Sequence, residues 1–217
     1  MYKVTVGVCC FKQRKWLYRC LRSLASQTLD RSKFEVIVVN DDPETDIEDV
    51  CNNLTDVMNI TLINNEKNLG LPASLNKILS VSRGRYFVRV DCDDYVSDQF
   101  LSYLSLFLDM NRENQAVSCD YREVNSVGSV VNYHISSLEN PIACGVMFTY
   151  ESLCEIGYYD ESFKMREGHD LMKRFNCKFK VFNLPVPLYR YRKHESNRTL
   201  NKDEVFKYDK RLSEDLK

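Results

Sequence analysis

Short apolar runs alternate with amphipathic stretches along the first half of the chain. The runs are rich in β-branched residues and predict strands at residues 4–10, 34–39, 60–63 and 86–90. Between them, apolar residues recur at helical spacing and predict helices at residues 16–27, 46–54 and 72–81. Strands that alternate with helices form a mainly parallel sheet with right-handed crossovers. The predicted fold class is therefore α/β, with a mixed, mainly parallel sheet flanked by helices and a Rossmann-like first half.

The second half of the chain is less regular. We predict helices at residues 100–108, 150–156 and 171–175, and short strands at residues 116–119, 144–148, 180–184 and 188–191. The polar stretch 122–138 is expected to be flexible or to form a hairpin. In the tail 202–217, Val205, Tyr208 and Leu212 recur at intervals of three and four residues, which predicts a surface helix.

The composition fits one globular domain over residues 1–217. Hydrophobic residues make up 44%, and 30 Lys and Arg residues nearly balance 31 Asp and Glu residues. That balance argues against general nucleic-acid binding. The nine cysteines are odd in number and contain no C-x-x-C pair, so we expect reduced thiols in a cytoplasmic protein. No apolar run reaches the roughly 20 residues needed to span a bilayer.

Acidic residues follow two of the predicted strands. Asp41 comes after the strand at 34–39, and a cluster at residues 91–94 contains three carboxylates, Asp91, Asp93 and Asp94. Carboxylates at that density repel one another unless a cation lies between them, and their oxygens suit Mg²⁺ or Mn²⁺. Because the carboxyl ends of parallel strands share one edge, the two groups should line one cleft.

The first predicted strand should end at the same edge, next to Asp41. It would place Cys9 and Phe11 in the cleft. A carboxylate can accept a hydrogen bond from a base, an aromatic ring can flank the base, and a metal can bridge two phosphates. These features predict a site for a nucleoside diphosphate. The sequence contains neither G-x-G-x-x-G nor a P-loop, which argues against dehydrogenases and P-loop NTPases.

Six segments, in order along the chain, resemble those of family 2 glycosyltransferases with the GT-A fold. They are the opening strand and helix, the strand with its base-binding acid, an N-x-G-L-x-x-S-L-N segment, a D-x-D metal motif, a G-x-F-D-E-x-F segment and a closing Y-R-x-H segment. Here they lie at residues 4–28, 35–41, 68–76, 91–94, 157–163 and 189–198. The resemblance therefore covers nearly the whole chain.

The resemblance implies a role for each matching residue. Asp41 would contact the nucleobase, with Cys9 and Phe11 beside it, and Asp91 would lie near the ribose. Asp93, supported by Asp94, would hold Mn²⁺ or Mg²⁺ on the diphosphate, and His194 would complete or flank that site. The cations expected to neutralise the leaving diphosphate are Arg198 and Arg192.

The catalytic base is where the chain departs from the family. An inverting transferase needs a group that takes the proton of the acceptor hydroxyl, and the family provides it in an E-D-x-D-L segment. Here the segment contains Gly168 in place of the second acid. Glu167 and Asp170 are the preferred candidates, and His169 stays open. Asp170 also suits the N-cap of a helix that begins at Leu171.

The resemblance implies transfer of a sugar from a nucleotide-sugar donor to a hydroxyl acceptor, with inversion. The acceptor would be a glycan or a lipid-linked glycan, as in surface-polysaccharide assembly. Residues 1–97 would form the donor half, 98–201 the acceptor half and 202–217 a helical tail. Peripheral attachment to the inner face of the membrane and homo-oligomer formation stay open.

Two other functions compete with this prediction. A sugar-phosphate nucleotidyltransferase also uses a nucleotide and a divalent ion, but that class opens with a glycine-rich loop, and residues 9–14 contain no glycine. A catalytically degenerate module that still binds nucleotide sugars would explain Gly168.

Overall fold

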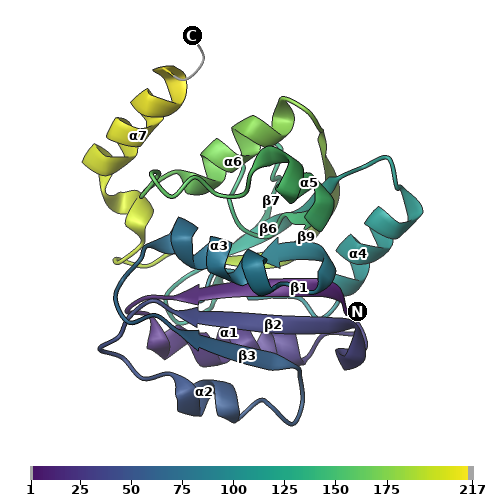
Figure 1. Cartoon of the computed structure of the whole chain (residues 1–217), viewed down its shortest axis with the longest axis vertical. Coiled ribbons are helices and arrows are strands. Elements are labelled where there is room, and N and C mark those ends of the chain that lie inside the picture. The colour runs from purple at the N-terminus through teal and green to yellow at the C-terminus, as the bar shows by residue number, and fades with distance from the viewer. Residues whose placement is uncertain (1, 215–217) are drawn as a thin grey trace.

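The computed structural model describes residues 2–214 as a layered α/β domain (Figure 1). The strands are β1 (Tyr2–Cys10), β2 (Phe34–Asn40), β3 (Ile60–Asn64), β4 (Gly84–Arg89), β5 (Tyr95–Val96), β6 (Ala116–Val124), β7 (Val130–Ile135), β8 (Met147–Thr149) and β9 (Val181–Arg192). The α-helices are α1 (Arg14–Ala25), α2 (Glu48–Asn52), α3 (Leu71–Val81), α4 (Phe100–Met110), α5 (Tyr150–Ile156), α6 (Glu167–Asn176) and α7 (Lys202–Glu214). Two short 3₁₀ helices cover Arg31–Lys33 and Arg198–Leu200.

The strands form one sheet in the order β3-β2-β1-β4-β8-β6-β9-β5, and β7 pairs with β6. The first four strands in this order run parallel, as do β6 and β9. β8, β7 and β5 run antiparallel to their partners. The expected mixed, mainly parallel sheet is therefore confirmed.

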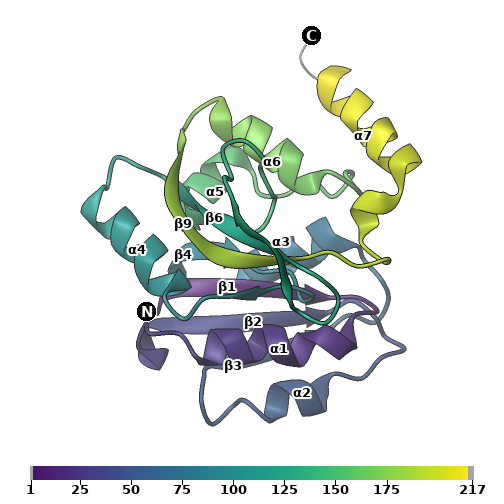
Figure 2. The ribbon, with the colours of Figure 1, turned by 180° about the vertical axis from the view of Figure 1, so that it is seen from behind.

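Helices cover both faces of the sheet. On one face, α1, α2 and α4 pack against side chains such as Val6, Val38 and Val88 (Figure 2). On the other face, α3, α5 and α6 pack against Ile37 and Phe87. Strands buried on both faces need near-continuous apolar sequence, which is why the runs were recognisable along the chain.

Three boundaries in the second half differ from the prediction. The strands expected at 180–184 and 188–191 are one strand, β9, whose pairing with β6 shifts register around Asp120. Two prolines lie in this stretch, and an irregular register accommodates residues that cannot donate to the ladder. The strand expected at 144–148 is β8, which begins only at Met147, and α6 begins at Glu167 rather than at Leu171.

Two other predictions about this half are confirmed. Residues 122–138 contain the hairpin of β6 and β7. The tail forms helix α7 over Lys202–Glu214, at the edge of the molecule (Figure 1), and its last residues, 215–217, lie outside the described residues. All nine cysteines have free thiols, and Cys154 and Cys177 are exposed. Within residues 2–214, none of the helices combines the length and the apolar character that a membrane crossing requires.

Candidate functional site

The carboxyl ends of β1, β2 and β4 open onto a cavity of about 740 Å³. Its strand side is lined by the predicted residues Cys9, Phe11, Asp41, Asp91 and Asp93. The two acidic groups therefore lie at one edge of the sheet, as the parallel order requires. A volume of this size is typical of small-molecule sites. The opposite side is lined by residues 141–144, 164–167 and 196–199, together with Glu161, His169, Tyr191 and Glu204.

Asp41 is a buried carboxylate that organises the loop before α3. Its Oδ1 accepts hydrogen bonds from Asn65 Nδ2 and the Leu69 amide, both at 2.8 Å, and its Oδ2 accepts one from the Gly70 amide at 2.9 Å. Gly70 has a φ of +88°, a conformation that glycine adopts without strain. A carboxylate offers about four acceptor positions, so one position remains for a donor in the cavity.

Arg89 joins Asp91 to Glu167 across the cavity floor. Its Nε and Nη2 donate to the Asp91 carboxylate at 2.5 and 3.0 Å, and its Nη1 donates to Glu167 Oε1 at 2.8 Å. The side chains of Arg89 and Glu167 are each 7% exposed. Burial disfavours a lone charge, yet these two carboxylates raise the pKa of Arg89 well above its usual value. The guanidinium therefore stays charged and holds both acids in place.

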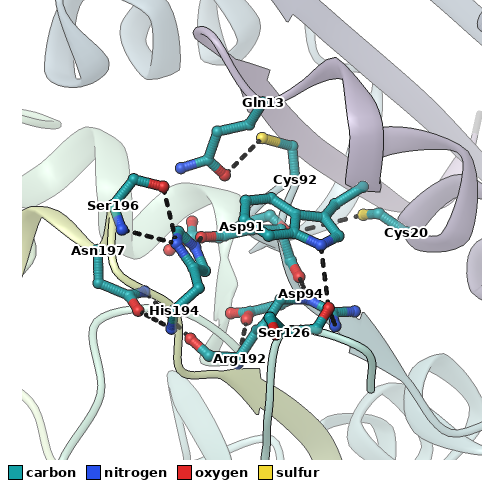
Figure 3. Close-up of polar contacts among 12 residues, drawn as sticks. Gln13, Cys20, Asp91, Cys92, Asp94, Ser126, Arg192, His194, Ser196 and Asn197 are labelled. Atoms are coloured by element: carbon teal, nitrogen blue, oxygen red, sulfur yellow. Dashed lines mark hydrogen bonds and ion pairs between the residues drawn. The ribbon is translucent and has the colours of Figure 1, made fainter.

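Asp93 meets His194 at the far end of the D-x-D segment. His194 Nε2 lies 2.8 Å from Asp93 Oδ2, and the His194 ring packs against Trp16 with 4.1 Å between ring centroids. The amide and hydroxyl of Ser196 lie 3.2 and 2.9 Å from His194 Nδ1 (Figure 3). Burial and the neighbouring Asp91 raise the pKa of Asp93, while His194 opposes that rise.

Asp94 lies in the protein interior behind the cavity. Its Oδ2 accepts a hydrogen bond from the Tyr189 hydroxyl at 2.8 Å, and its Oδ1 accepts one from the Arg192 amide at 2.7 Å. Burial, Asp93 and Asp91 raise the pKa of Asp94 well above its usual value. Asp94 thus anchors the end of the D-x-D segment to β9, and it supports the neighbouring acids rather than lining the cavity.

Arg192 also lies outside the cavity lining, although it was expected to face the diphosphate. It is 1% exposed, and its guanidinium donates to the carbonyl groups of Asp93, Asn125 and Ser126 (Figure 3). Arg192 therefore pins the turn between β6 and β7 beneath the D-x-D segment. Arg198, by contrast, lines the cavity as expected, and its Nη2 donates to the Lys164 carbonyl.

The acids of α6 have separate surroundings. Glu167 faces the cavity, whereas Asp170 accepts two hydrogen bonds from Arg174 at 2.9 and 2.7 Å and does not line it. Arg174 in turn donates to the carbonyls of Ile156 and Tyr158, so Asp170 helps to fix α6 onto the end of α5. The N-cap expectation for Asp170 is wrong, because α6 begins at Glu167 and Arg166 occupies the N-cap.

His169 is the third polar side chain at the start of α6, and it also lines the cavity. Burial and the nearby Arg166 lower the pKa of His169, so the ring is neutral at pH 7. Gly168 has no room for a side chain, because a Cβ there would lie 2.3 Å from Ala143 Cβ. Ala143 occupies the space that an acid at position 168 would need.

The charged groups at the strand edge suit a hard divalent cation. Asp91 and Asp93 both line the cavity, and burial and the Asp91 charge raise the pKa of Asp93, an effect that a bound cation would oppose. Oxygen ligands of this kind match Mg²⁺ or Mn²⁺. A second grouping, formed by Asp91, Asp94 and Cys144, has ligand atoms within 4.8 Å of one another, but Asp94 and Cys144 are buried.

Two residues at the site were not singled out from the sequence. Asn65 follows β3 at the same sheet edge, and it bonds to Asp41, to Ser74 and to Lys77. Its position after a strand was a usable signal. The Tyr189 hydroxyl accepts a bond from the Asp91 amide at 3.1 Å and donates to Asp94, a role that becomes visible only when β9 is placed beside the D-x-D segment.

The chain is similar to known proteins in sequence and in fold. Residues 5–167 match the family model described as glycosyl transferase family 2. Glycosyltransferase GlyA of Streptococcus pneumoniae is 27% identical over 133 residues, which are 61% of this chain and 19% of that protein. Poly(ribitol-phosphate) beta-N-acetylglucosaminyltransferase TarS of Staphylococcus aureus is 29% identical over 110 residues, which are 50% of this chain and 19% of that protein.

Solved structures show the same fold. Residues 1–349 of Staphylococcus aureus TarS, in complex with UDP-GlcNAc, superpose with a TM-score of 0.79 at 20% identity, covering 92% of this chain and 61% of that one. The mannosyltransferase PcManGT of Pyrobaculum calidifontis, in complex with GDP-Man and Mn²⁺, gives 0.73 at 17% identity, covering 94% and 61%.

These proteins are longer than the chain described here. The chain spans only 19% of GlyA and 38% of the putative glycosyltransferase EpsH of Bacillus subtilis. The family model nevertheless covers most of the chain and includes the strand-edge acids and Glu167. The chain belongs to glycosyl transferase family 2 and has the GT-A fold.

Proposed function

We propose that the protein transfers a sugar from a nucleotide-sugar donor to a hydroxyl group of an acceptor, with inversion at the anomeric carbon. The observation that carries the proposal is the meeting of Asp41, Asp91, Asp93 and Glu167 around one cavity of about 740 Å³. Three of these acids come from the ends of parallel strands, where α/β sheets bind ligands. The fourth comes from the opposite wall, where an acceptor can approach.

The strand side of the cavity, lined by Cys9, Phe11, Asp41, Asp91 and Asp93, is called the strand wall below. It suits the nucleotide. Asp41 keeps one acceptor position for an N–H of the base, and Phe11 is 41% exposed beside it. The thiol of Cys9 is neutral, because burial raises its pKa far above the usual value. Cys9 therefore offers a small apolar contact to the base rather than a charge. The Asp91 side chain, which Arg89 holds, is 27% exposed. It lines the cavity, where it would lie near the ribose.

The diphosphate is expected beside Asp93 and Arg198. Asp93, supported by Asp94 and flanked by His194, would hold Mn²⁺ or Mg²⁺, which stabilises the negative charge of a departing diphosphate when bound. Arg198 lines the same cavity and adds a second positive charge on the protein side. Charge that develops on a leaving group is stabilised most by groups already in position before the reaction.

Glu167 is the proposed catalytic base. The acceptor oxygen forms a bond to the anomeric carbon as the bond from that carbon to the diphosphate breaks. The Glu167 carboxylate takes the hydroxyl proton, and the nucleoside diphosphate leaves with the bonding electron pair.

We favour Glu167 over Asp170, because Glu167 lines the cavity while the Asp170 carboxylate is engaged by Arg174. A carboxylate that accepts only one hydrogen bond, from Arg89, retains capacity for a proton.

The proposed acceptor is a hydroxyl of a glycan or a lipid-linked glycan, reached from the cytoplasmic face of the membrane. The related TarS proteins are named for transfer of N-acetylglucosamine to poly(ribitol-phosphate), which makes UDP sugars the first donors to test. The GDP-mannose complex of PcManGT makes GDP sugars the second.

A donor-binding module without catalysis is the second candidate. It is favoured by Gly168, where the contact with Ala143 leaves no space for the acid of the family pattern. Such a module would keep the strand wall intact, since Asp41, Asp91 and Asp93 do not depend on position 168.

Both candidates are tested by binding and turnover in the same protein. Thermal unfolding is measured with UDP, GDP, UDP-GlcNAc and GDP-mannose, each with and without Mn²⁺. A ligand present at 100 times its Kd stabilises the native state by about 2.7 kcal/mol. Release of nucleoside diphosphate from each sugar nucleotide is then measured. Asp93→Ala removes the proposed metal ligand, and Asp56→Ala, an exposed acid away from the cavity, is the matched control.

The transferase proposal expects a metal-dependent stabilisation by one nucleotide that is lost in Asp93→Ala and kept in Asp56→Ala, together with release of the diphosphate. Binding without any release, even with added glycan acceptors, supports the binding module instead. If none of the nucleotides shifts the unfolding midpoint of the unmodified protein, both candidates are wrong.

A further inference from the structure

An ion pair connects helix α7 to Arg166 in the cavity wall, beside a bond from Lys173 of α6 to the Leu212 carbonyl. Arg166 Nη2 donates to Asp209 Oδ2 at 3.0 Å, and Arg166 Nε lies 2.8 Å from the other oxygen of the same carboxylate. Arg166 directly precedes α6 and lines the cavity. Asp209 belongs to α7, beyond the residues that match the family model. The C-terminal helix therefore reaches the wall that carries Glu167.

The backbone at Arg166 is in a conformation that needs support. Its φ is +66°, in the left-handed region, which costs a residue with a side chain on the order of 1–3 kcal/mol. Such residues persist where surrounding contacts hold them, and they gather at functional sites. The ion pair with the Asp209 carboxylate is a contact of this kind, because the hydrogen bond from Nη2 holds the guanidinium beside α7.

The same guanidinium also reaches His169. Arg166 Nη1 lies 3.2 Å from His169 Nε2. A guanidinium can only donate, so Nε2 is the acceptor and the ring proton is on Nδ1. Asp209, Arg166 and His169 therefore form a chain of contacts that ends at the cavity, two residues from Glu167 along the backbone.

The remaining contacts of α7 do not need Asp209. Tyr208 packs on Phe163 with 5.9 Å between ring centroids, and the Arg211 guanidinium lies 3.9 Å from the centre of the Phe163 ring. Val205 and Leu212 pack against the same small cluster. Because these contacts remain when the Asp209 charge is removed, a substitution there should leave α7 docked.

We infer that Asp209 is a positioning residue for the reaction, which through Arg166 holds His169 and the start of α6 in the orientation that presents Glu167 to the acceptor. The inference rests on the proposed transferase function. It assigns the C-terminal helix a part in the acceptor side of the site, whereas the donor side is built from the strand ends. Glu204 of α7 also lines the cavity, in agreement with that assignment.

The kinetic test compares variants on one helix. Asp209→Asn keeps the shape and loses the charge, and Asp209→Glu restores the charge. Glu214→Gln is the control, since Glu214 is exposed and pairs with exposed Lys210 at 3.7 Å. We expect kcat of Asp209→Asn to fall on the order of 10- to 100-fold, because small displacements of reacting groups are costly. The donor KM and the unfolding midpoint should stay close to those of Glu214→Gln, and Asp209→Glu should recover part of the loss.

A second readout follows the pKa of His169 by NMR, which is practical in a chain with three histidines. Arg166 and Glu167 act on the ring from the start of α6, Asp209 from α7 and Arg89 from β4. Burial and Arg166 lower the pKa of His169, while Glu167 and Asp209 raise it. Loss of the Asp209 charge with Arg166 still in place would lower the pKa further, whereas release of Arg166 would raise it.

A rise in the His169 pKa together with a lower kcat in Asp209→Asn supports the inference. A fall in the pKa overturns it, because Arg166 then keeps its place without Asp209. An unchanged kcat also overturns it, because the reaction then does not depend on Asp209. The NMR result does not require turnover. If the unmodified protein binds none of the sugar nucleotides, the proposed function fails, while the His169 titration still reports whether Asp209 holds Arg166.

Discussion

The two walls of the cavity are held by different kinds of contact. On the strand wall, Asp41 follows β2 directly and accepts bonds from the amides of Leu69 and Gly70. The opposite wall, called the α6 wall, contains Arg166, Glu167 and His169 at the start of α6. There, Glu167 is held by Arg89, 78 residues away, and Arg166 by Asp209, 43 residues away. The strand wall is part of the sheet, whereas the α6 wall depends on a few side-chain ion pairs. Single substitutions should therefore change turnover, which depends on the α6 wall, separately from donor binding, which depends on the strand wall.

The largest separation is expected from Glu167→Gln. The amide keeps an oxygen that can accept from Arg89, but it cannot take a proton. General bases contribute about 10²–10⁴-fold to rate, so turnover should fall by that factor. Donor binding, which depends on the strand wall, should stay within about twofold, far below the tenfold that 1.4 kcal/mol represents. Product formation and donor affinity are measured on the same preparation.

Asp170→Asn is the matched partner of that variant, because it changes an acid on the same helix. Asp170 accepts two bonds from Arg174, so its substitution should lower the unfolding midpoint more than the turnover of the folded enzyme. The opposite pattern, in which Asp170→Asn stops turnover and Glu167→Gln spares it, would show that α6 presents Asp170 to the acceptor in the working enzyme.

Asp41→Ala is expected to destabilise the strand wall and to weaken nucleotide binding. The change removes the acceptor of the partly buried Leu69 and Gly70 amides and one of the two acceptors of Asn65 Nδ2, which still donates to Ser74. Buried donors without a partner cost about 1–3 kcal/mol, so a loss near the upper end is expected. Urea unfolding measures the loss, and nucleotide affinity should fall with it. Asp42→Ala is the control: Asp42 is also buried, but it does not line the cavity. If Asp42→Ala weakens the nucleotide as much as Asp41→Ala does, Asp41 has no specific role.

The strand wall could be predicted from the sequence, and the α6 wall only in part. Asp41 and Asp91 follow strands, so the parallel order alone brings them together. The candidates Glu167 and Asp170 could not be ranked, because their difference depends on Arg89 and Arg174, which the chain pattern does not link to either acid. Pairings between distant side chains follow from how α6 packs on the sheet, and no local spacing encodes them. The same holds for Arg192, whose motif position suggested the diphosphate but whose side chain is buried.

The smallest effect is expected from Gly168→Ala, which tests how tightly the α6 wall is packed. The new Cβ would lie 2.3 Å from Ala143 Cβ, and overpacking of this kind costs about 1–3 kcal/mol. Ala143→Gly removes the opposing atom, so the double variant should recover most of that loss, with a coupling energy of about 0.5–3 kcal/mol between the two positions. Unfolding free energies of both single variants and the double variant give the coupling. No loss of stability in Gly168→Ala, with a coupling near zero, would mean that Ala143 moves aside without cost, so that an acid could be accommodated at position 168. In that case Gly168→Asp alone should add a base to the site and raise turnover. A strong coupling means that the acid is excluded by the Ala143 side chain, so only Gly168→Asp combined with Ala143→Gly has room for it. This outcome would set the α6 wall of this chain apart from the family pattern by the side chain that faces position 168.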